Sequence, residues 1–148
     1  MSEEHGKPHY NLALLLELAY KRLDAALIRE MRTHGYADLR PAHSQVFGAI
    51  PPEGARVGEM AAQAGITQQS MSELVDCLEQ LGYLERRIDP RDRRARIIAF
   101  TERGWDAVRA GIATVDAIER EWAQLIGVRR AEAMRAALEV IAFHDDVD

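Results

Sequence analysis

The chain is poor in the residues that disulfides, zinc sites and membrane spans require. It has one cysteine, Cys77, so an intramolecular disulfide is excluded, and its five histidines are scattered without zinc-ligand spacing. No apolar run approaches the roughly 20 residues of a membrane helix, and residues 1–8 lack the apolar centre of a signal peptide. These absences predict a cytoplasmic protein with no metal and no contact with a membrane.

Signatures of catalysis are missing as well. The sequence has no Gly-rich phosphate loop, no nucleophile elbow and no zinc-hydrolase motif. Its paired acids, Asp145 and Asp146, fall in the C-terminal tail that follows the last predicted helix. We therefore predict no catalytic residues, no cofactor and no enzymatic activity.

Positive charge is concentrated in one segment. The 148 residues carry a net charge of −5, and 47% of them are hydrophobic, enough for one domain with a buried core. Between Glu85 and Arg96, six arginines against three acidic residues give a local charge of +3, which leaves −8 for the rest. Such a distribution predicts a protein that meets a polyanion with one face only.

The basic segment has the pattern of a β-hairpin. Two strand-like runs in residues 84–101 flank a turn at 89–93, where Pro90 fixes φ and the Asp89 carboxylate can accept backbone N–H groups. A stiff tip that carries guanidinium groups suits the DNA minor groove, whose negative potential deepens where it narrows. The alternative is a hairpin whose charges only protect its sheet edges. The arginines expected at the tip are Arg91, Arg93 and Arg94.

Other arginines of this hairpin have more than one predicted role. Arg86 and Arg87 are consecutive on a strand and so point to opposite faces, which leaves at most one of them facing a phosphate. We name Arg87 as that candidate. Arg94 either contacts DNA or pairs with an acid such as Asp92 or Asp76, which would hold the hairpin in place.

Two helices joined by a tight turn precede the hairpin. Apolar periodicity predicts helices at 57–64 and 67–81, separated by Gly65 and Ile66. Thr67 suits the N-cap of the second helix, and Gly82 suits the left-handed position after it. A short helix, a glycine turn and a second helix that begins with small polar residues are typical of a helix-turn-helix.

The first turns of the second helix are the predicted DNA-contacting surface. Glutamine can pair bidentately with adenine, and serine can reach base edges or phosphates. The alternative is an ordinary polar helix face, and Thr67 is expected to cap the helix more than to contact DNA. The candidates are Thr67, Gln68, Gln69, Ser70 and Ser72.

Long amphipathic helices flank this central part. Apolar spacing predicts helices at 11–33, 101–126 and 129–144, and a short helix that opens at Pro41. The apolar faces of the long helices are wider than the central part can cover. We therefore expect a second copy of the chain to interleave its terminal helices in a two-fold dimer, with a monomeric bundle as the alternative.

The order of elements and five sequence segments resemble the MarR family of bacterial regulators. The segments are Thr67–Ser72, Leu74–Glu79, Leu81–Leu84, Asp89–Arg94 and Phe100–Gly104. The resemblance implies a mainly α fold with a small β-hairpin, a winged helix-turn-helix whose terminal helices form an interleaved dimerisation region. It also implies dimerisation helices at 1–36 and 102–148, and a DNA-binding domain at 37–101.

The resemblance further implies a homodimeric, sequence-specific transcriptional regulator that binds double-stranded DNA at a two-fold operator. Such regulators are often repressors that a small aromatic or anionic effector, or oxidation, releases from DNA. The effector site would lie between the first helix, the short helix near Pro41 and the helix that follows Thr101. Its candidate lining residues are Tyr20, Arg22, Tyr36 and His43.

Three residues depart from the family's pattern. Glu73 stands in the second helix of the helix-turn-helix, where a neutral or basic residue is usual, and Gly58 replaces a Ser or Thr cap. Cys77 lies beside the apolar stripe of its helix, where packing would leave its thiol unreactive, so we expect no redox role. Glu73 and the acidic body motivate an alternative function, a winged-helix module that has lost DNA binding and binds another protein.

Overall fold

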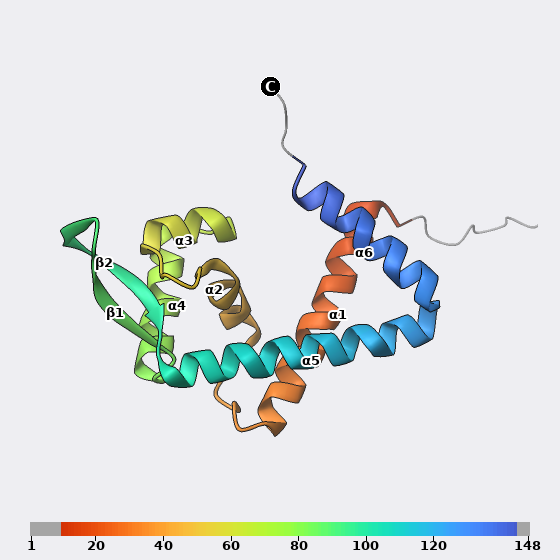
Figure 1. The fold of residues 1–148 in the computed structure, drawn as a ribbon, viewed down its shortest axis with the longest axis horizontal. Helices are drawn as coiled ribbons and strands as arrows, with labels where there is room; N and C mark the ends of the chain where they lie inside the picture. Colours follow the sequence, from red (N-terminus) through yellow and green to blue (C-terminus); the bar gives the residue numbers. More distant parts are fainter. Residues whose placement is uncertain (1–9, 145–148) are drawn as a thin grey trace, which may run out of the picture.

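The computed structural model describes residues 10–144, and its secondary structure is mainly helical (Figure 1). The helical elements are α1 (Leu12–Thr33), the 3-10 turn η1 (Pro41–His43), α2 (Ser44–Ala49), α3 (Val57–Ala64), α4 (Gln68–Gln80), α5 (Glu102–Ile126) and α6 (Val128–Ala142). The strands β1 (Leu84–Asp89) and β2 (Asp92–Phe100) form one antiparallel sheet. The predicted mainly α fold with a small β-hairpin is confirmed.

Side-chain caps define where three helices begin. The Asn11 carboxamide oxygen accepts the Leu14 N–H at 2.9 Å, and the hydroxyls of Thr67 and Thr101 each accept the backbone N–H three residues on, at 3.1 Å. The predicted cap at Thr67 is therefore confirmed. These bonds satisfy N–H groups that the helix itself leaves without partners.

Helix α3 has the predicted bounds, but its N-cap differs from the expectation. Its N-cap is Arg56, and the Glu59 carboxylate accepts the Arg56 N–H at 3.0 Å. The expectation that Gly58 occupies the cap position is wrong, because the cap lies two residues earlier and Gly58 is the second residue of the helix. At the other end of the helix-turn-helix, Gly82 has φ +85° as predicted.

The hairpin, called the wing below, has a shorter connection than predicted. Asp89 pairs with Asp92 across the ladder, so only Pro90 and Arg91 connect the strands. Arg93 and Arg94 therefore belong to β2, although the sequence pattern assigned Arg93 to the turn. A shift of register between Ile88 and Asp89 accommodates the tight connection.

The core lies between the helix-turn-helix, the wing and the first turns of α5. Tyr83, Ile98 and Met71 are fully buried there. Tyr83 also joins separate elements: its hydroxyl donates to Asp38 at 2.5 Å, and the Arg103 guanidinium donates to the same carboxylate at 2.9 Å. This network fastens the base of the wing to α5.

Helix α5 extends from the wing end of the molecule to the α6 end, and α1 crosses it (Figure 1). At the α6 end, many large apolar side chains are exposed, and no residue of α6 is buried. We call this the terminal apolar surface. It comprises Tyr10, Leu12, Leu14, Leu15, Leu16, Leu18 and Tyr20 before and in α1, and Met134, Leu138, Val140, Ile141 and Phe143 in and after α6.

Candidate nucleic-acid interface and ligand pocket

The start of α4 presents the predicted polar residues to solvent. Thr67, Gln68, Gln69 and Ser70 are all exposed, whereas Ser72 is half-buried. The Thr67 hydroxyl donates to the Ser70 hydroxyl at 2.8 Å while it accepts the Ser70 N–H. Thr67 is thus engaged within the helix start.

Glu73 lies on the same face of α4 as Gln69. The Gln69 carboxamide donates to the Glu73 carboxylate at a long 3.5 Å, a weak hydrogen bond that a base edge can replace. The Gln68 carboxamide lies against α3, since a Cβ added at Gly58 would be 3.5 Å from its oxygen. The Gln68 side chain is therefore more restricted than that of Gln69, and Gln69 is the better placed to contact a base.

The wing tip is fastened to α3 through a buried carboxylate. Asp89 has no exposed surface, and it accepts from Arg56 Nε at 2.8 Å and from the Arg91 backbone N–H at 2.8 Å. These bonds, the backbone N–H foremost, lower the pKa of Asp89 to about 2. The tip of the wing is consequently held in one orientation relative to the helix-turn-helix.

Arg91 belongs to the same network. Its guanidinium lies 3.3 Å from Asp89 and 3.5 Å from Glu59, and these two acids raise its pKa. Arg91 thus has carboxylate partners, although its side chain remains two-thirds exposed. Sequence reasoning missed Arg56 and Glu59, because nothing in the local pattern around them signals a partner more than 30 residues away.

Two further wing arginines are held by acids. Arg86 pairs with Asp76 at 2.6 Å and with Glu79 at 3.3 Å, both on α4. Arg87 pairs with Glu85 on its own strand. Both guanidinium groups therefore have a carboxylate to neutralise them.

The guanidinium groups of Arg93 and Arg94 form no ion pair within residues 10–144. Asp92 accepts only the backbone N–H of Arg94, at 3.0 Å, and Asp76 is taken by Arg86. The alternative in which Arg94 forms an ion pair with either acid is therefore wrong, and Arg93 and Arg94 are available to a polyanion.

Cys77 is exposed, so the expected apolar packing of its thiol is wrong. The buried stripe of α4 consists of Met71, Val75 and Leu78, at spacings of four and three, and residue 77 falls outside it. Cys77 is next to Leu78 in sequence, but one residue corresponds to about 100° of rotation around a helix. Closeness in sequence to the core residues therefore did not place the Cys77 side chain in the core.

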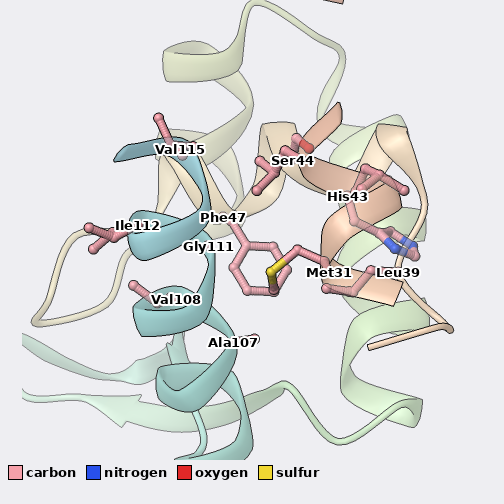
Figure 2. A pocket seen from close by; sticks show the side chains of 13 residues that line it. Met31, Leu39, His43, Ser44, Phe47, Ala107, Val108, Gly111, Ile112 and Val115 are labelled. Carbon is pink, nitrogen blue, oxygen red and sulfur yellow. The ribbon is translucent and has the colours of Figure 1, made fainter. Parts of the chain in front are cut away.

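A pocket of about 380 Å³ lies between α1, the η1–α2 segment and α5. Figure 2 shows the α5 residues on one side and Phe47 and Met31 across from them. Its lining residues are Leu27, Ile28, Met31, Leu39, His43, Ser44, Phe47, Gly48, Ala107, Val108, Gly111, Ile112 and Val115. The elements are those expected for an effector site.

His43 is the one expected residue that lines this pocket, because Tyr20, Arg22 and Tyr36 lie outside the lining. Burial, followed by the charge of Arg40, lowers the pKa of His43, so its imidazole is uncharged at neutral pH. Its Nδ1 atom accepts the Arg40 backbone N–H at 3.0 Å, which leaves the proton on Nε2. The pocket wall near η1 is thus neutral.

Metal sites and membrane spans are not found in the part of the chain that the structure describes. Between residues 10 and 144, no three His, Cys, Asp or Glu side chains are grouped as a metal site would require. No helix in the same range combines the length and the hydropathy needed to span a bilayer.

Comparison with known proteins gives a consistent result. A family model described as the MarR family matches residues 26–95. The crystal structure of CouR from Rhodococcus jostii RHA1 bound to p-coumaroyl-CoA is 29% identical, with a TM-score of 0.71, and the match covers 93% of this chain and 96% of that one. CouR described as a transcriptional repressor bound to a 23-mer DNA duplex is 25% identical, with a TM-score of 0.69, over 89% of this chain and 92% of that one.

A curated relative matches a smaller part of the chain. The exopolysaccharide II synthesis transcriptional activator ExpG of Rhizobium meliloti is 28% identical over 96 residues, 65% of this chain. The match spans half the length of that relative. These proteins are transcription regulators, which supports the expectation that the chain is not an enzyme.

Proposed function

We propose that the chain is a MarR-family transcriptional regulator, a homodimeric repressor that a small ligand releases from a two-fold operator, and the family match and the similarity to CouR support this proposal. The observation that carries the DNA-binding part is the exposed start of α4 together with three exposed wing arginines, Arg93, Arg94 and Arg96, that have no ion-pair partner in the described residues; Arg96 donates only to backbone carbonyls. A transcription regulator acts where the DNA is, so its proposed location is the cytoplasm.

In this proposal the DNA-binding domain is residues 37–101. Gln69 and Ser70 contact base edges in the major groove, with Gln68 and Ser72 at the margin of the contact and Thr67 as the cap. Minor-groove and phosphate contacts come from the wing, with Arg93 and Arg94 ahead of the others. Arg87 and Arg91 contribute charge from positions that Glu85, Asp89 and Glu59 partly neutralise.

The proposed dimer uses residues 1–36 and 102–148, of which 1–9 and 145–148 lie outside the described residues. Its support is the terminal apolar surface, whose twelve large apolar side chains are each more than a third exposed, an arrangement that marks a protein–protein contact. A second copy covers it with the same surface under two-fold symmetry. The two α4 helices then address half-sites about one helical turn, or 10 base pairs, apart.

The proposed effector binds in the pocket between α1, α2 and α5. Phe47 lines this pocket, and its ring lies 5.5 Å from Phe100 at the end of β2 and 6.1 Å from Tyr83 at the base of the wing. A ligand that displaces Phe47 would therefore shift the wing relative to α5. CouR, bound to p-coumaroyl-CoA, makes an aromatic acyl thioester a reasonable effector class to test.

The first experiment determines whether the chain recognises DNA sequence. Selection from randomised duplexes is performed with the native chain and with a Gln69→Ala, Ser70→Ala double variant. Removal of each base contact should cost roughly 1–3 kcal/mol at the preferred site and little on random DNA, so the specific-to-nonspecific ratio should fall. Recovery of the same motif with the same ratio would remove Gln69 and Ser70 from the assignment.

The alternative function, a protein-interaction module, predicts a different result. Such a module would enrich no motif, and its weak binding to genomic fragments would lack a steep dependence on salt. Light scattering on the intact chain tests the other half of the proposal. A well-folded monomer at micromolar concentration would contradict both the dimer and the two-fold operator.

A further inference from the structure

Four glycines lie within the helices of residues 10–144 and have ordinary helical backbone angles. Glycine in a helix interior is destabilising relative to alanine, so each needs a reason. Gly104 has one, since a Cβ there would lie 2.1 Å from the Tyr83 carbonyl oxygen. Gly58 is in ordinary contact range of Gln68. Gly48 and Gly111 have no such neighbour.

A Cβ added at either Gly48 or Gly111 would meet no atom within 4 Å. Both residues line the pocket, one from α2 and the other from α5, where Gly111 is seen in Figure 2. Packing within the chain therefore does not explain them. Both glycines lack a side chain that would otherwise extend into the pocket and reduce its volume.

The remaining lining decides what can fill that space. It contains no lysine, arginine or carboxylate, and its two polar side chains each have a hydrogen-bond partner outside the lining, which leaves the uncharged His43 Nε2–H as the remaining donor. His43 accepts the Arg40 backbone N–H, and the Ser44 hydroxyl donates to Asp24 at 2.6 Å. A carboxylate placed inside would be desolvated without a cationic partner, which is strongly unfavourable.

The same wall favours an aromatic ring over an alkyl chain. Phe47 offers a ring for stacked or edge contacts, and the Met31 thioether gives favourable contacts with ring edges. A flat ring also suits a space that is widened by the absence of side chains on two facing helices.

We propose that Gly48 and Gly111 are specificity-determining residues that admit an uncharged, planar aromatic group, any anionic part of the ligand staying outside the pocket. The inference rests on the proposed effector site and specifies its ligand class. It narrows the aromatic or anionic effector expected from sequence to one whose buried part is aromatic and neutral.

Two matched probes test the charge requirement, methyl cinnamate and cinnamate, which differ in one ionised carboxyl group. Calorimetric titration of the intact native chain at neutral pH should give an affinity for the ester about tenfold or more above that for the acid. Tighter binding of cinnamate, or no binding of the ester, would overturn the proposal.

Glycine variants test the size requirement. Gly111→Ala and Gly48→Ala should each weaken methyl cinnamate binding by about tenfold, and Gly111→Leu should weaken it by about a hundredfold. Their thermal midpoints should equal or exceed that of the native chain, because alanine and leucine favour helix and a Cβ at either position meets no atom within 4 Å. Gly58→Ala, the same change in a helix outside the pocket, should leave probe binding unchanged.

Folded variants that bind the ester as well as the native chain does would overturn the role of the two glycines. DNA binding by the native chain is measured in parallel without any probe. Failure there would refute the proposed regulator, whereas normal DNA binding with no effect of the glycine variants would refute the present inference alone.

Discussion

Arg93 offers the sharpest test of the wing, because the structure supplies a matched control on the same hairpin. Arg93 is exposed on β2 and has no carboxylate partner within residues 10–144. Arg86 is exposed on β1 and pairs with Asp76 and Glu79. Both substitutions to alanine remove one positive charge from the wing, but only Arg93→Ala removes one that is available to DNA.

The expected loss of DNA-binding free energy doubles in a dimer, because each substitution is present in both wings. An arginine that contacts DNA contributes about 1–3 kcal/mol, so affinity should fall by at least about 2 kcal/mol, or roughly thirtyfold. Removal of two phosphate-neutralising charges should also reduce the slope of log K against log salt by about 1.8. Arg86→Ala breaks exposed ion pairs, which contribute about 0–1 kcal/mol to stability, and it should change DNA affinity by less than about threefold.

The measurement is fluorescence anisotropy of a labelled duplex that carries the selected motif, at four or more salt concentrations. Circular dichroism of each variant confirms that the fold is retained. Equal affinities and equal salt slopes for Arg93→Ala and Arg86→Ala would refute the argument that unpaired wing arginines contact DNA. The wing would then be a charged hairpin that only protects its own edges.

Three further predictions concern stability. Tyr83→Phe removes the donor to Asp38 and should lower the free energy of unfolding by about 1.5–3 kcal/mol in urea titrations; an unchanged midpoint would mean that Arg103 alone satisfies this carboxylate. Gly104→Ala places a Cβ 2.1 Å from the Tyr83 carbonyl oxygen and should cost about 3 kcal/mol or more, so a native thermal midpoint would contradict the close approach of α5 to the Tyr83 backbone. Because the pKa of Asp89 is depressed to about 2, its contribution is fully present above about pH 4, its unfolded value, and is lost as the pH falls through 2. Asp89→Asn should therefore reduce the fall in unfolding free energy between about pH 4 and pH 2. If the native chain and the variant gave parallel curves of unfolding free energy against pH, this role of Asp89 would be refuted.

Several features of the chain were determined by its sequence alone. The caps at Thr67 and Thr101 and the reversal at Gly82 depend on hydrogen bonds and backbone angles within a few residues, which residue type and position predict. The buried stripe of α4 follows from helical periodicity. The winged helix-turn-helix was predictable for the same reason, since its elements follow one another in order along the chain.

Tertiary structure alone decided which wing arginines are available. Six arginines in one segment look alike in sequence, yet Arg86 is neutralised by acids on α4 and Arg91 by Asp89 and Glu59. An ion pair depends on a separation of a few ångströms between groups whose distance along the chain carries no such information. Only the tertiary contacts show that Arg93, Arg94 and Arg96 have no acidic partner among the described residues, and of these Arg96 donates to backbone carbonyls.

The side chains that line the pocket and the position of Cys77 also could not be predicted from the sequence. The family resemblance suggested four lining residues and only His43 lines the pocket, because whether a side chain faces inward depends on how α1, α2 and α5 cross. Gly48 and Gly111 carried no signal in the sequence, where a glycine suggests a turn or a helix end. Their meaning comes from empty space between helices that are distant in the chain, which is a property of packing and not of local sequence.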